Sequence, residues 1–201
     1  NPSTNEKPVT DLVGFTLDNS AILNHKENDN RKQVADLALL LFRQLKVLHK
    51  LPRSYVKILR IASTMHDVGR RIQFYGNEKN SFNIILNSDI CGVSHREIAL
   101  ASFIASCQNP NDFNLTEWIR YKDLFEEEDL EAMRKLAIIV RLASALDKTK
   151  RSVVQDISCD ILGDSVIMKT IVTMNADIEI REALKVANDF KKVYKKTLEV
   201  L

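Results

Sequence analysis

Apolar residues recur at helical spacing through most of this chain. The clearest case is the segment 31–49, where six apolar residues fall on one stripe of a helix: Val34, Leu37, Ala38, Leu41, Leu45 and Leu48. Similar spacing predicts helices over residues 9–23, 52–69, 80–87, 94–107, 126–146 and 182–195. The polar stretches 24–30 and 109–114 are expected to form a turn and a loop. The pattern therefore indicates a mainly helical body.

The pattern changes after residue 151. Residues 152–161 and 166–174 alternate between apolar and polar side chains, as in strands that bury one face. Residues 178–180 are predicted to form a third short strand, and residues 197–201 a last one after the helix 182–195. We therefore expect a helical domain over residues 1–151 and a small α+β subdomain over residues 152–201, with the order β-β-β-α-β.

Composition excludes several classes of function. The chain has 201 residues, 45% of them hydrophobic and 28% charged, as in ordinary globular proteins. A net charge of +2 does not favour a nucleic-acid partner. Three widely spaced cysteines indicate reduced thiols, and no apolar stretch approaches the roughly 20 residues needed to span a bilayer. We expect a cytoplasmic protein that binds neither membrane nor nucleic acid.

The sharpest chemical signal is the segment Met65-His66-Asp67-Val68-Gly69, at the end of a predicted helix. Adjacent His and Asp side chains can both reach one divalent metal ion, through an imidazole nitrogen and a carboxylate oxygen. Such an ion can activate water for attack on phosphorus. The pair by itself is equally compatible with a capped helix end that binds no ligand.

A second acidic residue extends this signal. Asp147 ends the segment Arg141-Leu-Ala-Ser-Ala-Leu-Asp147 and lies seven residues after Val140, near the inward face of the helix 126–146. A His-Asp pair followed much later by such an Asp resembles the HD-domain phosphohydrolases, in which the distant Asp joins the pair at the metal. The resemblance implies an HD-like helical body.

The match narrows to one family. The chain resembles the C-terminal half of exopolyphosphatases and guanosine-pentaphosphate phosphatases from about residue 23 to residue 201. Several segments carry the resemblance in the same order: 33–42, 65–69, 80–89, 141–147, 153–156 and 163–164. Polyphosphate and guanosine pentaphosphate fit equally well as the substrate of the parent protein.

The resemblance implies a remnant metal site. Its ligands would be His66, Asp67 and Asp147, and its ion Mn²⁺, Ni²⁺ or Mg²⁺. The family often has His at three positions where this chain has an amide: Asn30, Asn80 and Gln108. Amide oxygens bind transition metals less strongly than imidazole does. We therefore expect weak metal binding at best, and no independent hydrolysis.

The family's phosphatase activity resides in two N-terminal actin-like domains, whose sequence this chain does not contain. The resemblance implies those domains as partners, a homodimer, and basic side chains that hold polyphosphate. The candidate phosphate-binding residues are Arg70, Arg71, Arg141, Lys148, Lys150 and Arg151. The alternative for these residues is a solvated helix end, or for Arg141 an ion pair with a carboxylate such as Glu131 or Asp67.

Three functions are open at this point. The first is the C-terminal domain of an exopolyphosphatase-type phosphohydrolase, active in substrate binding, dimerisation or regulation. The second is a metal-dependent phosphohydrolase that acts on a nucleotide. The third is a non-catalytic protein-interaction module. We predict the first, with a chain that is inactive by itself.

Overall fold

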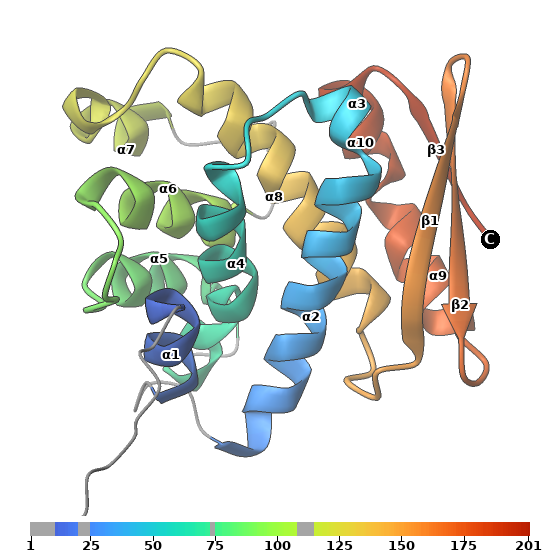
Figure 1. Ribbon diagram of the computed structural model, residues 1–201, viewed down its shortest axis with the longest axis horizontal. Helices are drawn as coiled ribbons and strands as arrows, with labels where there is room; N and C mark the ends of the chain where they lie inside the picture. The colour runs from blue at the N-terminus through green and yellow to red at the C-terminus, as the bar shows by residue number, and fades with distance from the viewer. Residues whose placement is uncertain (1–10, 20–24, 73–74, 108–114) are drawn as a thin grey trace, which may run out of the picture.

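The computed structural model describes residues 11–19, 25–72, 75–107 and 115–201, with the backbone alone for residues 25–30 and 115. A body of helices lies beside a three-stranded sheet (Figure 1). The body consists of α1 (Leu12–Asn19), α2 (His25–Gln44), α3 (Lys46–His49), α4 (Tyr55–Met65), η1 (Val68–Arg71), α5 (Glu78–Leu86), α6 (His95–Ser106), α7 (Leu115–Arg120), η2 (Lys122–Leu124) and α8 (Asp129–Leu146). The C-terminal part consists of β1 (Val154–Leu162), β2 (Ser165–Val172), α9 (Asp177–Lys185), α10 (Ala187–Tyr194) and β3 (Thr197–Val200). The predicted fold class, a mainly helical body with a small α+β part, is confirmed.

Helix α8 lies at the centre of the molecule. It contacts α2, α4, α6, α9 and α10, and its residues from Leu136 to Val140 are buried on every side. A helix that is apolar all round belongs in a core rather than at a surface. The apolar stripe predicted over residues 31–49 also faces the core, since all of its members except the half-buried Leu48 are buried, although α2 ends at Gln44 and Leu48 lies in α3. Because α8 and α2 pack into the core, the polar residues at the ends of these two helices are held in fixed positions.

The boundaries of several helices differ from the prediction, and the predicted helices 31–49 and 182–195 are each divided in two. Residues 25–30, predicted as a turn, form the first turns of α2. This run has no apolar residue and so gives no periodic signal, whereas backbone hydrogen bonds can continue a helix through polar residues. The helix predicted from Pro52 begins at Tyr55 and ends at Met65, and the short η1 follows it. The predicted loop 109–114 lies outside the described residues.

The sheet has the order β1-β2-β3. Strands β1 and β2 form an antiparallel hairpin with Leu162 opposite Ser165, and Gly163 in the turn has a φ of 53°. Strand β3 runs parallel to β2, with Val166 opposite Leu198. Helices α9 and α10 make the crossover that a parallel pair requires. Buried residues of all three strands join the core of the helical body, so the division at residue 151 stays a prediction.

The predicted third strand, residues 178–180, is wrong. These residues lie in helix α9, so the C-terminal part has the order β-β-α-α-β. The buried face of α9 carries Ala176, Glu179 and Ala183, at spacings of three and four residues. Because Glu179 occupies a buried position, the apolar signal of this face is broken. The alternation of the exposed Ile178 and the half-buried Ile180 around Glu179 then resembles a strand.

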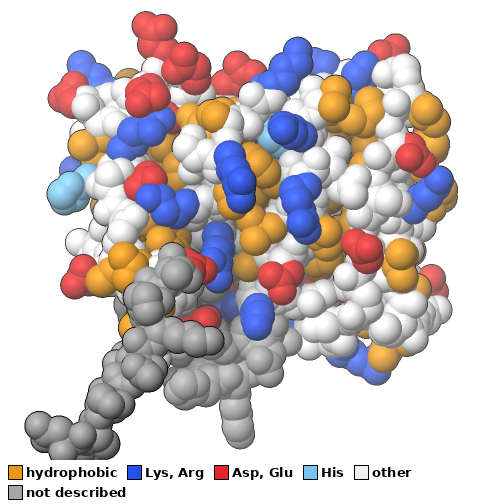
Figure 2. All heavy atoms as spheres, in the orientation of Figure 1, with side chains coloured by type: hydrophobic (Ala, Val, Ile, Leu, Met, Phe, Trp, Pro, Cys, Tyr) orange, Lys and Arg blue, Asp and Glu red, His pale blue; other side chains and the backbone are white. Residues whose placement is uncertain are grey.

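Charge is distributed unevenly over the surface. Lys and Arg side chains gather on the face formed by α2, α3 and α4, with apolar side chains between them (Figure 2). Arg43, Lys46, Lys50 and Arg53 are exposed there, and Val47 between them is 71% exposed. A net charge of +2 therefore hides a distinct basic face. None of the helices that the structure describes has the length and apolar composition of a membrane-spanning segment.

Candidate functional site

Two adjoining pockets lie where the end of α4 meets α8. Pocket A has a volume of about 260 Å³ and extends toward α6 and α9, and pocket B has a volume of about 60 Å³ and extends toward α2 and the end of α8. Both are lined by His66, Asp67, Arg70, Ser144 and Lys148. Asp147 lines pocket B as well. The structure thus brings the three predicted metal ligands together around pocket B.

His66 is held in one orientation by two hydrogen bonds. Its Nδ1 lies 2.8 Å from the carbonyl oxygen of Ser63, so Nδ1 carries the proton and donates. Its Nε2 then accepts from the hydroxyl of Ser144 at 3.2 Å. Burial of the ring lowers the pKa of His66 and favours the neutral form. The nitrogen that a metal would need is therefore already engaged.

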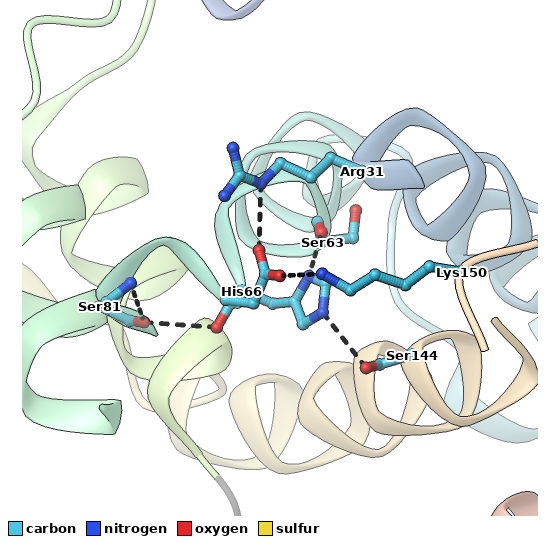
Figure 3. Close-up of polar contacts among 8 residues, drawn as sticks. Arg31, Ser63, His66, Ser81, Ser144 and Lys150 are labelled. Carbon is cyan, nitrogen blue, oxygen red and sulfur yellow. Dashed lines mark hydrogen bonds and ion pairs between the residues drawn. The ribbon is translucent and has the colours of Figure 1, made fainter. Parts of the chain in front are cut away.

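Asp67 bridges two cations (Figure 3). Its Oδ1 accepts from Nε of Arg31 at 3.0 Å, and its Oδ2 accepts from Nζ of Lys150 at 3.3 Å. The side chains of Arg31 and Asp67 are only 3% and 8% exposed. Burial alone would raise the pKa of Asp67, but His66, Arg31 and Lys150 outweigh it and hold the pKa below its ordinary value. Asp67 is thus an ionised carboxylate with a cation on each oxygen.

Gly69 fixes the position of the His-Asp pair. A Cβ at residue 69 would lie 2.2 Å from the carbonyl oxygen of Asn77 and 2.5 Å from the amide nitrogen of Ser81. The amide of Gly69 donates to Oγ of Ser81 at 3.0 Å (Figure 3). Only a residue without a side chain allows η1 to approach α5 this closely. This contact holds His66 and Asp67, which directly precede η1, in the lining of the two pockets.

Asp147 ends α8 and is 4% exposed. Its Oδ1 accepts from the amide of Ser152 at 2.9 Å. Its Oδ2 is buried and has no hydrogen-bond partner among the described residues. Burial is the main cause that raises the pKa of Asp147, and Glu179 adds to it, against the opposing effects of Ser152 and Lys150.

This arrangement does not fit a divalent metal ion. Both oxygens of Asp67 already bind cations, and Nε2 of His66 already accepts a hydrogen bond. Within the part of the chain that the structure describes, no group of three or more His, Cys, Asp or Glu side chains could hold a metal. An incoming ion would have to displace Arg31 and Lys150 against their charge. The assignment of His66, Asp67 and Asp147 as ligands stays a prediction.

The predicted basic residues divide into three groups. Arg70 and Lys148 line both pockets and are exposed. Arg141 lines pocket A, and Lys150 lines pocket B. Arg71 and Arg151 line neither pocket. Arg141 forms an ion pair at 2.8 Å with Asp189 of α10, rather than with Glu131 or Asp67.

Sequence reasoning missed two basic residues of the site. Arg31 is the buried partner of Asp67, and Lys185 lines pocket A and pairs with Glu182. The sequence does indicate that Arg31 is buried, because Arg31 lies three residues before Val34 and seven before Ala38, on the buried stripe of α2. A charged residue on such a stripe requires a buried partner.

Comparison with known families places this geometry in context. The family described as Ppx/GppA phosphatase, domain III, matches residues 14–190. No curated protein matches the sequence. The family match includes every residue that lines the two pockets and covers far more than half of the chain. The resemblance drawn from the sequence is confirmed: the chain belongs to the Ppx/GppA phosphatase family, as a domain III.

Proposed function

We propose that this domain binds polyphosphate at pockets A and B and so contributes substrate binding to a Ppx/GppA phosphatase. The charge of the two linings supports this. Six cations line them, Arg31, Arg70, Arg141, Lys148, Lys150 and Lys185, against three carboxylates, Asp67, Asp147 and Glu182. A concave surface with an excess of one charge concentrates ligands of the opposite charge.

The observation that carries the proposal is the position of Lys148. It lines both pockets, is exposed, and has no ion pair with any residue that the structure describes. Four of the other cations are held by carboxylates of the protein: Arg31, Arg141, Lys150 and Lys185. These ion pairs hold the lining of the two pockets in place. The ammonium group of Lys148 can donate three hydrogen bonds to a phosphate.

The rival function, a metal-dependent phosphohydrolase, is less well supported. It requires an ion to polarise water at His66 and Asp67. The nitrogen and oxygen atoms that would bind this ion already accept from Ser144, Arg31 and Lys150. Electrostatic binding requires no such ion. We therefore propose a binding role without independent hydrolysis.

A charge reversal at Lys148 tests this proposal. Lys148→Glu should weaken the binding of long-chain polyphosphate by about tenfold or more. It should also reduce the slope of log affinity against log salt concentration by about one. Lys46→Glu is the matched control, since Lys46 is also an exposed lysine without an ion pair among the described residues, on the basic face of α2 to α4. Titration calorimetry at several salt concentrations measures both quantities.

Equal affinities for the wild type and Lys148→Glu would refute the proposal. A loss confined to Lys46→Glu would move the polyphosphate to the basic face. A loss of equal size in both variants would indicate long-range attraction without a defined pocket.

Membership of the family adds two further proposals, namely the N-terminal actin-like domains as partners and a homodimer. Sedimentation of the chain over a range of concentrations tests the second. A molecular mass of one chain at all concentrations would contradict it. A cytoplasmic location also stays a prediction.

A further inference from the structure

The buried carboxylate of Asp147 has an unused acceptor beside a cationic pocket. Asp147 is 4% exposed and lines pocket B, its Oδ1 is bound to Ser152, and its Oδ2 has no partner among the described residues. A buried carboxylate oxygen without a donor is costly, and native structures rarely tolerate one. Such an atom points to a ligand that brings a donor.

The other charges of pocket B determine what kind of ligand this is. Arg31, Arg70, Lys148 and Lys150 line it together with the carboxylates of Asp67 and Asp147. The excess of positive charge disfavours a metal ion or an amine as the missing donor. It attracts an anion, so the ligand must be an anion that also carries a hydrogen-bond donor.

The size of pocket B further limits which anions can bind there. A volume of about 60 Å³ is well below the roughly 300 Å³ at which pockets for larger organic ligands begin. Pocket B by itself is therefore too small for a nucleotide, whereas a tetrahedral oxyanion is of suitable size. Among such anions, monohydrogen phosphate carries one P–OH group near neutral pH, and sulfate carries none.

We infer that pocket B is a binding site for a protonated tetrahedral oxyanion, namely inorganic monohydrogen phosphate, which donates its P–OH hydrogen bond to Oδ2 of Asp147. The ammonium groups of Lys148 and Lys150 donate to the remaining oxygens. Lys150 uses one of its three N–H donors on Asp67, so two stay available. No bond is broken and no proton is transferred, so the step is recognition alone.

The inference deepens the proposed function, because Lys148 belongs to both pockets. It adds a property that general attraction of polyanions does not give. Sulfate and monohydrogen phosphate both carry two negative charges, so Coulomb attraction alone cannot separate them. A buried acceptor can, because sulfate would leave Oδ2 of Asp147 facing an oxygen without a proton.

The test is a comparison of three anions by titration calorimetry at about pH 8, where inorganic phosphate is the monohydrogen dianion. Phosphate and arsenate, which both carry a proton there, should bind at least about tenfold more tightly than sulfate. Sulfate binding equal to that of phosphate, or no binding of phosphate at all, overturns the inference.

The variant Asp147→Asn provides the matched control. An asparagine can still accept the amide of Ser152 through its carbonyl oxygen and turns a donor toward pocket B. The preference for phosphate over sulfate should fall toward unity, while urea unfolding verifies that the variant is folded. A preference that survives in a folded Asp147→Asn variant also overturns the inference.

Polyphosphate titrations on the same samples separate this inference from the proposed function. Polyphosphate binding without selectivity between phosphate and sulfate would leave the proposed function intact and remove the inference. Selective phosphate binding without polyphosphate binding would do the reverse.

Discussion

Removal of Arg31 tests the reasoning about the buried ion pairs. Arg31→Met keeps the aliphatic length of the side chain but leaves Lys150 as the one cation that pairs with Asp67 among the described residues. Loss of one partner of a buried pair costs about 3–5 kcal/mol, because the other charge stays buried and uncompensated. Lys150 is 44% exposed and screened by solvent, so it offsets only a small part. We expect the free energy of unfolding to fall by about 3 kcal/mol, measured by urea denaturation.

The double variant Arg31→Met/Asp67→Asn isolates the origin of this loss. Replacing the carboxylate by an amide of the same shape removes the uncompensated charge, so the double variant should recover a large part of the stability. The pH dependence gives a second check. The pKa of Asp67 is lowered in the folded protein, so its contribution is present above the unfolded pKa of about 4 and is lost as the pH falls through the folded value. The difference between wild type and Arg31→Met should therefore shrink as the pH drops below about 4.

Two results would refute the reasoning. A loss below about 1 kcal/mol for Arg31→Met would mean that this pair contributes no more to stability than an exposed salt bridge does. A double variant less stable than Arg31→Met would mean that Asp67 stabilises the fold by something other than its pairing with Arg31.

Three further substitutions test other parts of the frame, each by urea denaturation. Ser94→Ala removes a capping box at the start of α6 and should cost about 1 kcal/mol, whereas an unchanged midpoint would contradict the role of the cap. Gly69→Ala introduces the backbone clashes described above and should cost about 3 kcal/mol or more, and a stable variant would show that η1 can move away from α5. Asp129→Ala should cost about 3–5 kcal/mol, because buried Asp129 accepts from Tyr55 and Arg96, and a loss under about 1 kcal/mol would contradict this.

The helical body could be predicted because its helices follow the simple rule of an apolar stripe. Ser94 is an example in which local chemistry is sufficient: the segment Ser94-His95-Arg96-Glu97 has the pattern of a capping box, and the structure contains both hydrogen bonds between Ser94 and Glu97. Gly163 is a second example, because a glycine between two alternating segments favours a turn, and Gly163 lies in the turn of the β1-β2 hairpin. Such features depend on residues within a few positions of one another, so a sequence contains all the information that they need.

The errors arose where a polar residue occupies a buried position. Glu179 interrupts the apolar face of α9 and made a helix resemble a strand, because its partner, Thr149, is 30 residues away. The stripe of α2 indicates that Arg31 is buried, but it does not indicate that the partner of Arg31 is Asp67, 36 residues away. Long-range polar pairs leave no periodic signal. Only the three-dimensional arrangement shows which charges neutralise each other.

The arrangement around Asp67 also explains why binding and hydrolysis can separate in this domain. Where the resemblance to HD domains implies a divalent ion, Arg31 and Lys150 supply two positive charges on tethered side chains. These cations give pocket B a positive charge, which attracts phosphate without a bound metal. They cannot act as a Lewis acid toward bound water, which is what a metal contributes to hydrolysis. Under the proposed function, a domain built in this way would retain the electrostatics of a phosphohydrolase site and hold phosphate, and it would leave the chemistry to another part of the parent phosphatase.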